Sequence, residues 1–158
     1  MTKTINDHGP LWPLPDEAAT AALAQRMAAS LDDGMVLYLH GPLGAGKTSF
    51  ARALLTTLGV GERVKSPTYS LMERYTARDR PAWHLDLYRI ADPGELEWLG
   101  LDALTDPDAL VLVEWPERGA GALPAADIEL CLDYAGDGRQ ARLRSFTPRG
   151  DGLLRQMG

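Results

Sequence analysis

Hydrophobic positions along the chain follow two patterns, one typical of amphipathic helices and one typical of buried strands. From Pro15 onwards, apolar residues recur at helical spacing, which predicts a helix that ends near Gly34. Two short apolar runs, Met35–His40 and Ala109–Trp115, predict strands in the centre of a sheet. Apolar residues along one side of residues 47–58 predict a second helix.

Outside this centre, the remaining strands are predicted by shorter segments of alternating character. Residues 69–75 and 82–88 predict two strands joined across residues 76–81. Residues 127–134 and 139–146, joined by a glycine turn, predict a hairpin with one wet face. We expect this hairpin to lie at an edge of the sheet, because only one of its faces is apolar.

The ends of the chain show little periodicity. Residues 1–14 predict an extended lead-in, and residues 149–158 predict a flexible tail. Between these ends, Asp92 and Glu95 flank a proline and predict the start of a short helix. The elements together predict a single α/β domain over residues 1–158, with the order of its strands left open.

Composition narrows the function classes. The chain has 158 residues, of which 45% are hydrophobic and 24% charged, and 16 basic against 22 acidic side chains give a net charge of −6. A protein whose main work is to grip nucleic acid needs a basic surface, so the acidic balance argues against that class. Cys131 is the only cysteine, so no internal disulfide can form. With no leader and no apolar run long enough for a membrane span, we expect a cytoplasmic protein.

Residues 41–48 read Gly-Pro-Leu-Gly-Ala-Gly-Lys-Thr and carry the strongest chemical signal. Glycines let the backbone curl so that successive N–H groups cradle a polyphosphate, and the following helix presents its positive end. Lys47 is then placed to neutralise phosphate, and the Thr48 hydroxyl to bind Mg²⁺. The alternative is a plain glycine turn. Because the loop follows an apolar strand and opens a helix, it predicts a three-layer α/β domain of the P-loop NTPase type with a mixed central sheet.

Candidate magnesium carboxylates lie on the neighbouring strands. Glu114 ends one apolar strand and Asp86 lies on the polar face of another. The alternative for both is a solvated strand end. The segment Lys65–Tyr69 fits a loop that senses nucleotide, or else a plain turn. His40 and His84 are interpreted as core or edge residues, and the cysteine as inert.

Four segments in order resemble the bacterial tRNA threonylcarbamoyladenosine biosynthesis ATPases, the TsaE (YjeE-like) family. They are residues 41–48, Lys65–Tyr69 (KSPTY), His84–Arg89 (HLDLYR) and Val113–Glu117 (VEWPE). The resemblance implies an ATPase needed to form N6-threonylcarbamoyladenosine at position 37 of tRNA. It also implies that the chain works with the partner proteins TsaD and TsaB and contacts tRNA only indirectly. Such an enzyme uses ATP and Mg²⁺ and hydrolyses ATP weakly when alone.

The resemblance also implies roles for individual residues. Lys47, Asp86 and Glu114 would be catalytic, and Thr48, Asp86 and Glu114 would surround Mg²⁺. Nucleotide contacts are implied for Glu17, Gly41, Gly44, Ala45, Gly46, Lys47, Thr48, Ser49, Thr68, Trp115, Glu117 and Arg139. The family often has Asp after the first glycine of the loop, where this chain has Pro42.

Two other functions remain open from the residues alone. A small-molecule kinase of similar size would share the phosphate loop but would need an acceptor pocket and often an arginine lid. Arg74, Arg78 and Arg80 could be mistaken for such a lid, but they lie in a predicted hairpin turn. A nucleotide-binding scaffold without useful hydrolysis would carry the same motif. The identity of the general base, between Asp86 and Glu114, also stays open.

Overall fold

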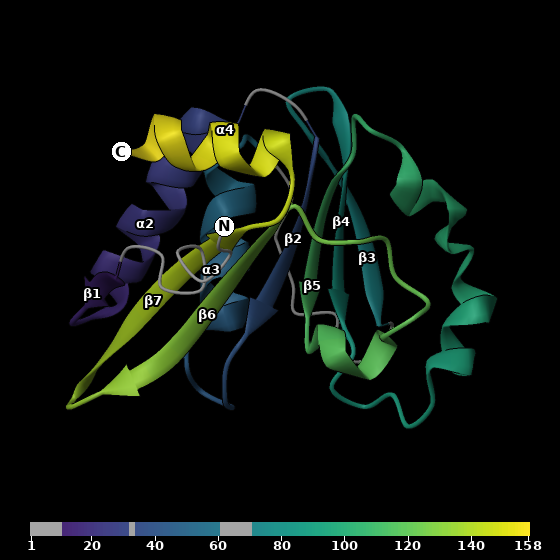
Figure 1. Ribbon diagram of the computed structural model, residues 1–158, viewed down its shortest axis with the longest axis horizontal. Coiled ribbons are helices and arrows are strands. Elements are labelled where there is room, and N and C mark those ends of the chain that lie inside the picture. Colours follow the sequence, from purple (N-terminus) through teal and green to yellow (C-terminus); the bar gives the residue numbers. More distant parts are fainter. Residues whose placement is uncertain (1–10, 32–33, 61–70) are drawn as a thin grey trace, which may run out of the picture.

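Seven strands form one mixed sheet in a computed structural model that describes residues 11–31, 34–60 and 71–158 (Figure 1). Their order across the sheet is β1-β7-β6-β2-β5-β4-β3. β2, β4, β5 and β6 run parallel, whereas β1, β3 and β7 pair antiparallel with their neighbours. The strands are β1 (Leu11–Leu14), β2 (Met35–His40), β3 (Met72–Ala77), β4 (Arg80–Asp86), β5 (Leu110–Glu114), β6 (Ile128–Ala135) and β7 (Gly138–Ser145).

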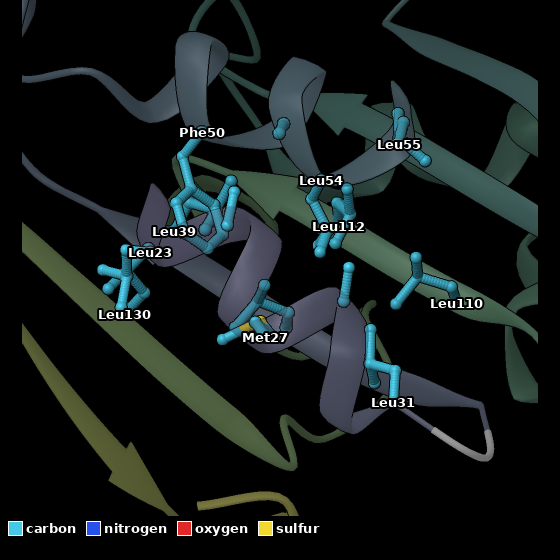
Figure 2. Close-up of a cluster of buried hydrophobic side chains, with 14 of the residues drawn as sticks. Leu23, Met27, Leu31, Leu39, Phe50, Leu54, Leu55, Leu110, Leu112 and Leu130 are labelled. Atoms are coloured by element: carbon cyan, nitrogen blue, oxygen red, sulfur yellow. The ribbon is translucent and has the colours of Figure 1, made fainter. Parts of the chain in front are cut away.

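One face of the sheet is covered by α-helices and the other by 3₁₀ segments, which gives the three layers expected (Figure 1). The helices are α2 (Glu17–Ser30), α3 (Lys47–Thr57) and α4 (Pro148–Met157), and the 3₁₀ segments are η1 (Pro93–Leu99), η2 (Leu101–Thr105) and η3 (Pro116–Gly119). Figure 2 shows the helix-side core, where Met27 of α2 and Leu54 of α3 pack over Leu112 of β5. Side chains alternate between the two faces of a strand, and both faces are covered, so the central strands are buried on both sides.

The central elements agree with the sequence pattern. The two apolar runs form β2 and β5, which pair in parallel so that their carboxyl ends lie side by side. The predicted helix after the glycine loop forms as α3, and Asp16 begins α2 by accepting a hydrogen bond from the Ala19 N–H at 2.9 Å. The Asp92 capping box is present, although the segment it begins is a 3₁₀ helix.

Both ends of the described chain differ from expectation. Residues 149–158 were expected to be a flexible tail, but residues 148–157 form α4, whose Leu153 and Met157 are buried. The last residues of the lead-in form β1, which pairs with β7 and is the edge strand of the sheet. The β6–β7 hairpin therefore lies inside the sheet, and its expected edge position is wrong.

The β3–β4 pair has a shorter turn than expected. Its turn is only Arg78–Asp79, since β3 runs to Ala77 and β4 begins at Arg80. Both turn residues have positive φ, at 51° and 64°, as two-residue hairpins require. The predicted start of this strand, and the Lys65–Tyr69 segment with Thr68, lie outside the described residues.

Candidate functional site

The glycine loop connects the carboxyl end of β2 to the amino end of α3. Gly41 has φ +148°, and a Cβ there would lie 2.5 Å from the Leu132 carbonyl oxygen of β6. Gly46 precedes α3 in the left-handed region, with φ +108°. These positions need glycine because one lies against backbone and the other is strained for any side chain. The loop thus brings the free N–H groups of a helix start to the end of the central strands.

Lys47, the first residue of α3, is only 5% exposed. Its Nζ donates to the carbonyl oxygens of Gly41 and, at 3.0 Å, of Pro42, and it lies 4.2 Å from the centroid of the Trp115 ring. Burial lowers the pKa of Lys47 below its ordinary value. The nearby carboxylates of Glu114 and Asp86 have the opposite effect but do not outweigh burial. An anion beside Nζ would favour the charged form further, so the position suits a phosphate.

Asp86 and Glu114 are direct neighbours at the ends of β4 and β5. Glu114 is 2% exposed, and its Oε1 accepts a hydrogen bond from Thr48 Oγ1 at 2.8 Å. Burial raises the pKa of Asp86 above its ordinary value, and the nearby Glu114 carboxylate adds to the rise. Two carboxylates and a hydroxyl are the oxygen donors that Mg²⁺ prefers, and a cation between them would relieve their repulsion. The donor set therefore fits the magnesium ion that the sequence motif implies.

His84 is the residue that sequence reasoning assigned only to the core. It is fully buried on β4, and its Nε2 lies 2.7 Å from Glu114 Oε2. Both oxygens of Glu114 are thus engaged, one by Thr48 and one by His84. The signal in the sequence was the spacing of two residues between His84 and Asp86, which places both side chains on the same face of β4. Glu114 pairs with Asp86 and therefore lies on that same face of the sheet.

A pocket of about 450 Å³ opens over this group. It is lined by segments that meet at the end of the sheet, namely residues 14–17 and 20, 43–49, 86 and 88, 114–115, and 137–139. Eleven of the residues implied as site residues thus line one pocket: Glu17, Gly44, Ala45, Gly46, Lys47, Thr48, Ser49, Asp86, Glu114, Trp115 and Arg139.

Two implied residues, Gly41 and Glu117, lie outside the pocket lining, and two that line it, Glu17 and Arg139, also contact α3 and the glycine loop. Gly41 contributes its carbonyl oxygen to Lys47 and does not line the pocket. Glu117 also lies outside the lining, with Oε1 3.8 Å from His40 Nδ1. Glu17 reaches the pocket from α2, where its Oε1 lies 3.4 Å from Ser49 Oγ. Arg139 contacts the glycine loop itself, through the carbonyl oxygen of Gly44.

Across the described residues, no group of three or more His, Cys, Asp and Glu side chains converges as a metal cluster. A divalent ion here would therefore depend on the Thr48 hydroxyl, and on oxygens that the protein does not supply, beside the two carboxylates. In the same part of the chain, no helix is both long and apolar enough to span a membrane.

A parallel strand, a glycine loop, a buried lysine and a hydroxyl bonded to a strand-end carboxylate together define the P-loop class of nucleotide-binding proteins. Within that class, the model of the family "Threonylcarbamoyl adenosine biosynthesis protein TsaE" matches residues 14–142. The chain therefore belongs to the TsaE family, whose members are named for biosynthesis of threonylcarbamoyladenosine in tRNA. The resemblance seen in the sequence is confirmed.

Relatives of known sequence or structure cover nearly the whole chain. The tRNA threonylcarbamoyladenosine biosynthesis protein TsaE of Haemophilus influenzae is 39% identical over 146 residues, covering 89% of this chain and 92% of that protein. TsaE of Bacillus subtilis is 36% identical over 140 residues, covering 89% and 86%. The crystal structure of Bacillus subtilis YdiB superposes with a TM-score of 0.79 at 29% identity, covering 94% of this chain and 93% of that one.

Proposed function

We propose that the chain is a Mg²⁺-dependent ATPase that supports formation of threonylcarbamoyladenosine in tRNA, together with the partner proteins TsaD and TsaB. One observation carries the ATPase part: Thr48 is bonded to the buried Glu114 directly beside Lys47, at the amino end of α3. Membership of the TsaE family supports the pathway. The partners are those that the family resemblance implies.

Each side chain in the pocket has a distinct task in this proposal. The backbone of residues 44–48 holds the phosphates, and Lys47 leaves the Gly41 and Pro42 carbonyl oxygens to meet them. Thr48, Asp86 and Glu114 would hold Mg²⁺, which when bound neutralises charge on the β- and γ-phosphate oxygens. Transfer of the terminal phosphoryl group to water then depends mainly on position and charge.

A carboxylate or a loop residue must also orient the attacking water, and among the described residues Asp86 and Glu114 are the candidate carboxylates. Glu114 has both oxygens engaged, by Thr48 and His84. Asp86 lies beside it at the pocket wall, and its Oδ1 accepts one backbone hydrogen bond, from the Tyr88 N–H at 3.1 Å. Asp86 is therefore the better placed of the two to hold water.

The decisive test is calorimetric titration of Mg–ATP into the wild-type chain and into Lys47→Ala. We expect Lys47→Ala to weaken binding by about 10- to 100-fold, the range for losing a hydrogen bond to a charged group. Arg155→Ala, which removes an exposed cation from the distant α4, is the matched control and should bind as wild type does. No heat on titrating adenine nucleotides into well-folded wild-type chain would refute the proposal.

Phosphate release with and without TsaB and TsaD separates the ATPase from the other two functions. We expect slow release by the chain alone and faster release with both partners. A phosphorylated acceptor would favour the kinase. The kinase is disfavoured by Arg78, one of its lid candidates, because its Nη1 is bonded to the carbonyl oxygens of Ala28 and Leu31 at 3.2 and 3.3 Å, at the end of α2.

A further inference from the structure

The tip of the β6–β7 hairpin holds the glycine loop from outside the sheet. Tyr134 and Arg139 are opposite each other in the hairpin, with the guanidinium 4.4 Å from the centroid of the Tyr134 ring. The Tyr134 hydroxyl donates to the Leu43 carbonyl oxygen. Arg139 donates to the next carbonyl oxygen, that of Gly44, through Nε at 3.3 Å and Nη2 at 3.2 Å.

These contacts engage two consecutive peptide units of the loop. In a trans peptide the N–H and C=O groups point in opposite directions, so a fixed carbonyl also fixes the N–H of the following residue. The Gly44 N–H belongs to the first of these units, and Gly44 lines the pocket. The Ala45 N–H belongs to the second and donates to the Pro42 carbonyl oxygen at 3.1 Å, within the loop. Gly44 has φ +80° and no Cβ, so the backbone alone would allow the Leu43–Gly44 unit to rotate.

Rotation of the Leu43–Gly44 unit would matter for binding an anion. A rotated unit would turn its carbonyl oxygen, which carries partial negative charge, towards the place where phosphates are expected. The packing is close on the hairpin side, because a Cβ on Gly44 would lie 2.9 Å from the Tyr134 hydroxyl oxygen. Yet Tyr134 is 46% exposed, so its ring adds little to the core. The position of the Tyr134 side chain is better explained by its hydrogen bond to the glycine loop than by a contribution to the stability of the fold.

We propose that Tyr134 and Arg139 form a clamp that holds the glycine loop by its Leu43 and Gly44 carbonyl oxygens and so keeps the Gly44 N–H in the orientation that receives phosphate. The inference rests on the proposed function and assigns both residues as positioning residues. Arg139 then acts through the loop backbone, in place of the direct nucleotide contact that the family resemblance implies. The clamp acts on the loop backbone and does not contact the terminal phosphate. Binding of diphosphate and triphosphate nucleotides should therefore depend on it equally.

The test uses Tyr134→Phe, which keeps the ring and removes only the hydroxyl, Arg139→Gln, and the double variant. Affinities for Mg–ATP and Mg–ADP are measured by calorimetry, and the thermal midpoint is measured without nucleotide. We expect each single variant to lose about three- to tenfold in affinity for both nucleotides, the range for one lost hydrogen bond. The double variant should lose less than the product of the two, because both act on one loop. The midpoint should hardly move.

The hairpin offers its own matched control. Arg144 lies 5.2 Å from the ring centroid of Phe146, an equivalent cation–aromatic pair away from the pocket, and Phe146 is 50% exposed. Phe146→Leu should bind both nucleotides as wild type does. Wild-type affinity in Tyr134→Phe would overturn the clamp while leaving the ATPase intact. Loss of ATP but not ADP affinity in Arg139→Gln would also overturn it, since that indicates direct contact with the terminal phosphate. Failure of the wild-type chain to bind either nucleotide would instead refute the proposed function.

Discussion

At the scale of single residues, the site is organised around one buried carboxylate. Glu114 takes a hydrogen bond from Thr48 on one oxygen and faces His84 on the other. A buried carboxylate is costly unless its oxygens are bonded, so these two contacts offset the cost of burying Glu114. They also fix the direction of Glu114 Oε1, the oxygen bonded to Thr48, which is itself a proposed metal ligand. His84 is thus part of the site's support, although it never reaches the pocket.

His84→Leu should therefore damage both stability and function. The variant leaves Glu114 Oε2 buried without a partner, which costs about 1–3 kcal/mol in the free energy of unfolding. It should also raise the Mg²⁺ concentration needed to support nucleotide binding, because Glu114 is free to turn. Urea unfolding measures the first effect, and calorimetric titration at several Mg²⁺ concentrations measures the second.

His84→Gln and a variant of His40 serve as controls for this prediction. Glutamine can donate to Glu114 and should recover part of both losses. His40 also lies on a central strand, but its Nε2 faces Glu129 at 2.9 Å, so His40→Gln should leave the Mg²⁺ requirement unchanged. An unchanged Mg²⁺ requirement in His84→Leu would show that the histidine only fills the core.

At the scale of elements, the sequence predicted what local patterns determine. Continuous apolar runs gave β2, which is bounded by glycine on both sides, and β5, and the loop motif gave the start of α3. Two elements were missed because their stability is tertiary. β1 carries Pro13, which is unfavourable in a central strand but tolerated at an edge. α4 contains two glycines, Gly150 and Gly152, and is held by burial of Leu153 and by the Arg26 side chain, whose Nε donates to the Met157 carbonyl oxygen at 2.6 Å.

The site was predictable as a set of residues but not as a geometry. Spacing predicted that Lys47 and Thr48 lie at the start of a helix after the glycine loop, and α3 begins there, since both follow from one local motif. The engagement of Glu114 by His84 depends on which strands are neighbours, and no local pattern encodes the order of parallel strands. The clamp by Tyr134 and Arg139 likewise depends on β6 lying beside β2, at a separation of more than ninety residues from the loop in sequence.

Asp127 joins three elements and should give stability a defined dependence on pH. Its carboxylate accepts from the Val36 N–H at 2.8 Å, from Thr147 Oγ1 at 2.7 Å and from Arg149 Nε at 2.9 Å. Burial raises the pKa of Asp127, but these hydrogen bonds and the Arg149 charge outweigh burial and leave it below its ordinary value. The folded state therefore favours the carboxylate, and its stabilisation is present above the ordinary pKa of about 4.

Asp127→Asn should accordingly lower the free energy of unfolding by about 1–3 kcal/mol at neutral pH. The difference from wild type should shrink as the pH falls below about 4 and through the lowered pKa, because wild type then loses the same charge. Chemical unfolding at several pH values measures this difference. Asp79→Asn, which removes an exposed carboxyl in the β3–β4 turn, is the control and should show little change at any pH. A pH-independent difference would contradict the assigned cause.

At the scale of the whole molecule, the sheet collects the site at one end. β2, β4 and β5 are parallel neighbours, so the glycine loop, Asp86 and Glu114 all meet at their carboxyl ends. Ligands bind at this end of open α/β sheets generally, because loops and helix starts converge there. The β6–β7 hairpin and β1 extend the sheet on one side and close the pocket wall. The buried central strands thus position the charged side chains of the site, and the outer strands form part of the pocket wall.

The overall charge leads to a prediction about tRNA, the molecule named in the biosynthesis to which the family belongs. With 16 basic against 22 acidic side chains, the chain carries a net charge of −6 and should be repelled by a polyanion at long range. We expect the isolated chain to bind Mg–ATP but to bind tRNA only with a Kd above about 10 µM near physiological salt, within the range of non-specific binding. Filter binding of labelled tRNA at several salt concentrations tests this, with calorimetry of Mg–ATP on the same sample as proof of folding. Tight binding that weakens steeply with salt would mean that a local basic surface outweighs the net charge, and the chain would then contact tRNA directly.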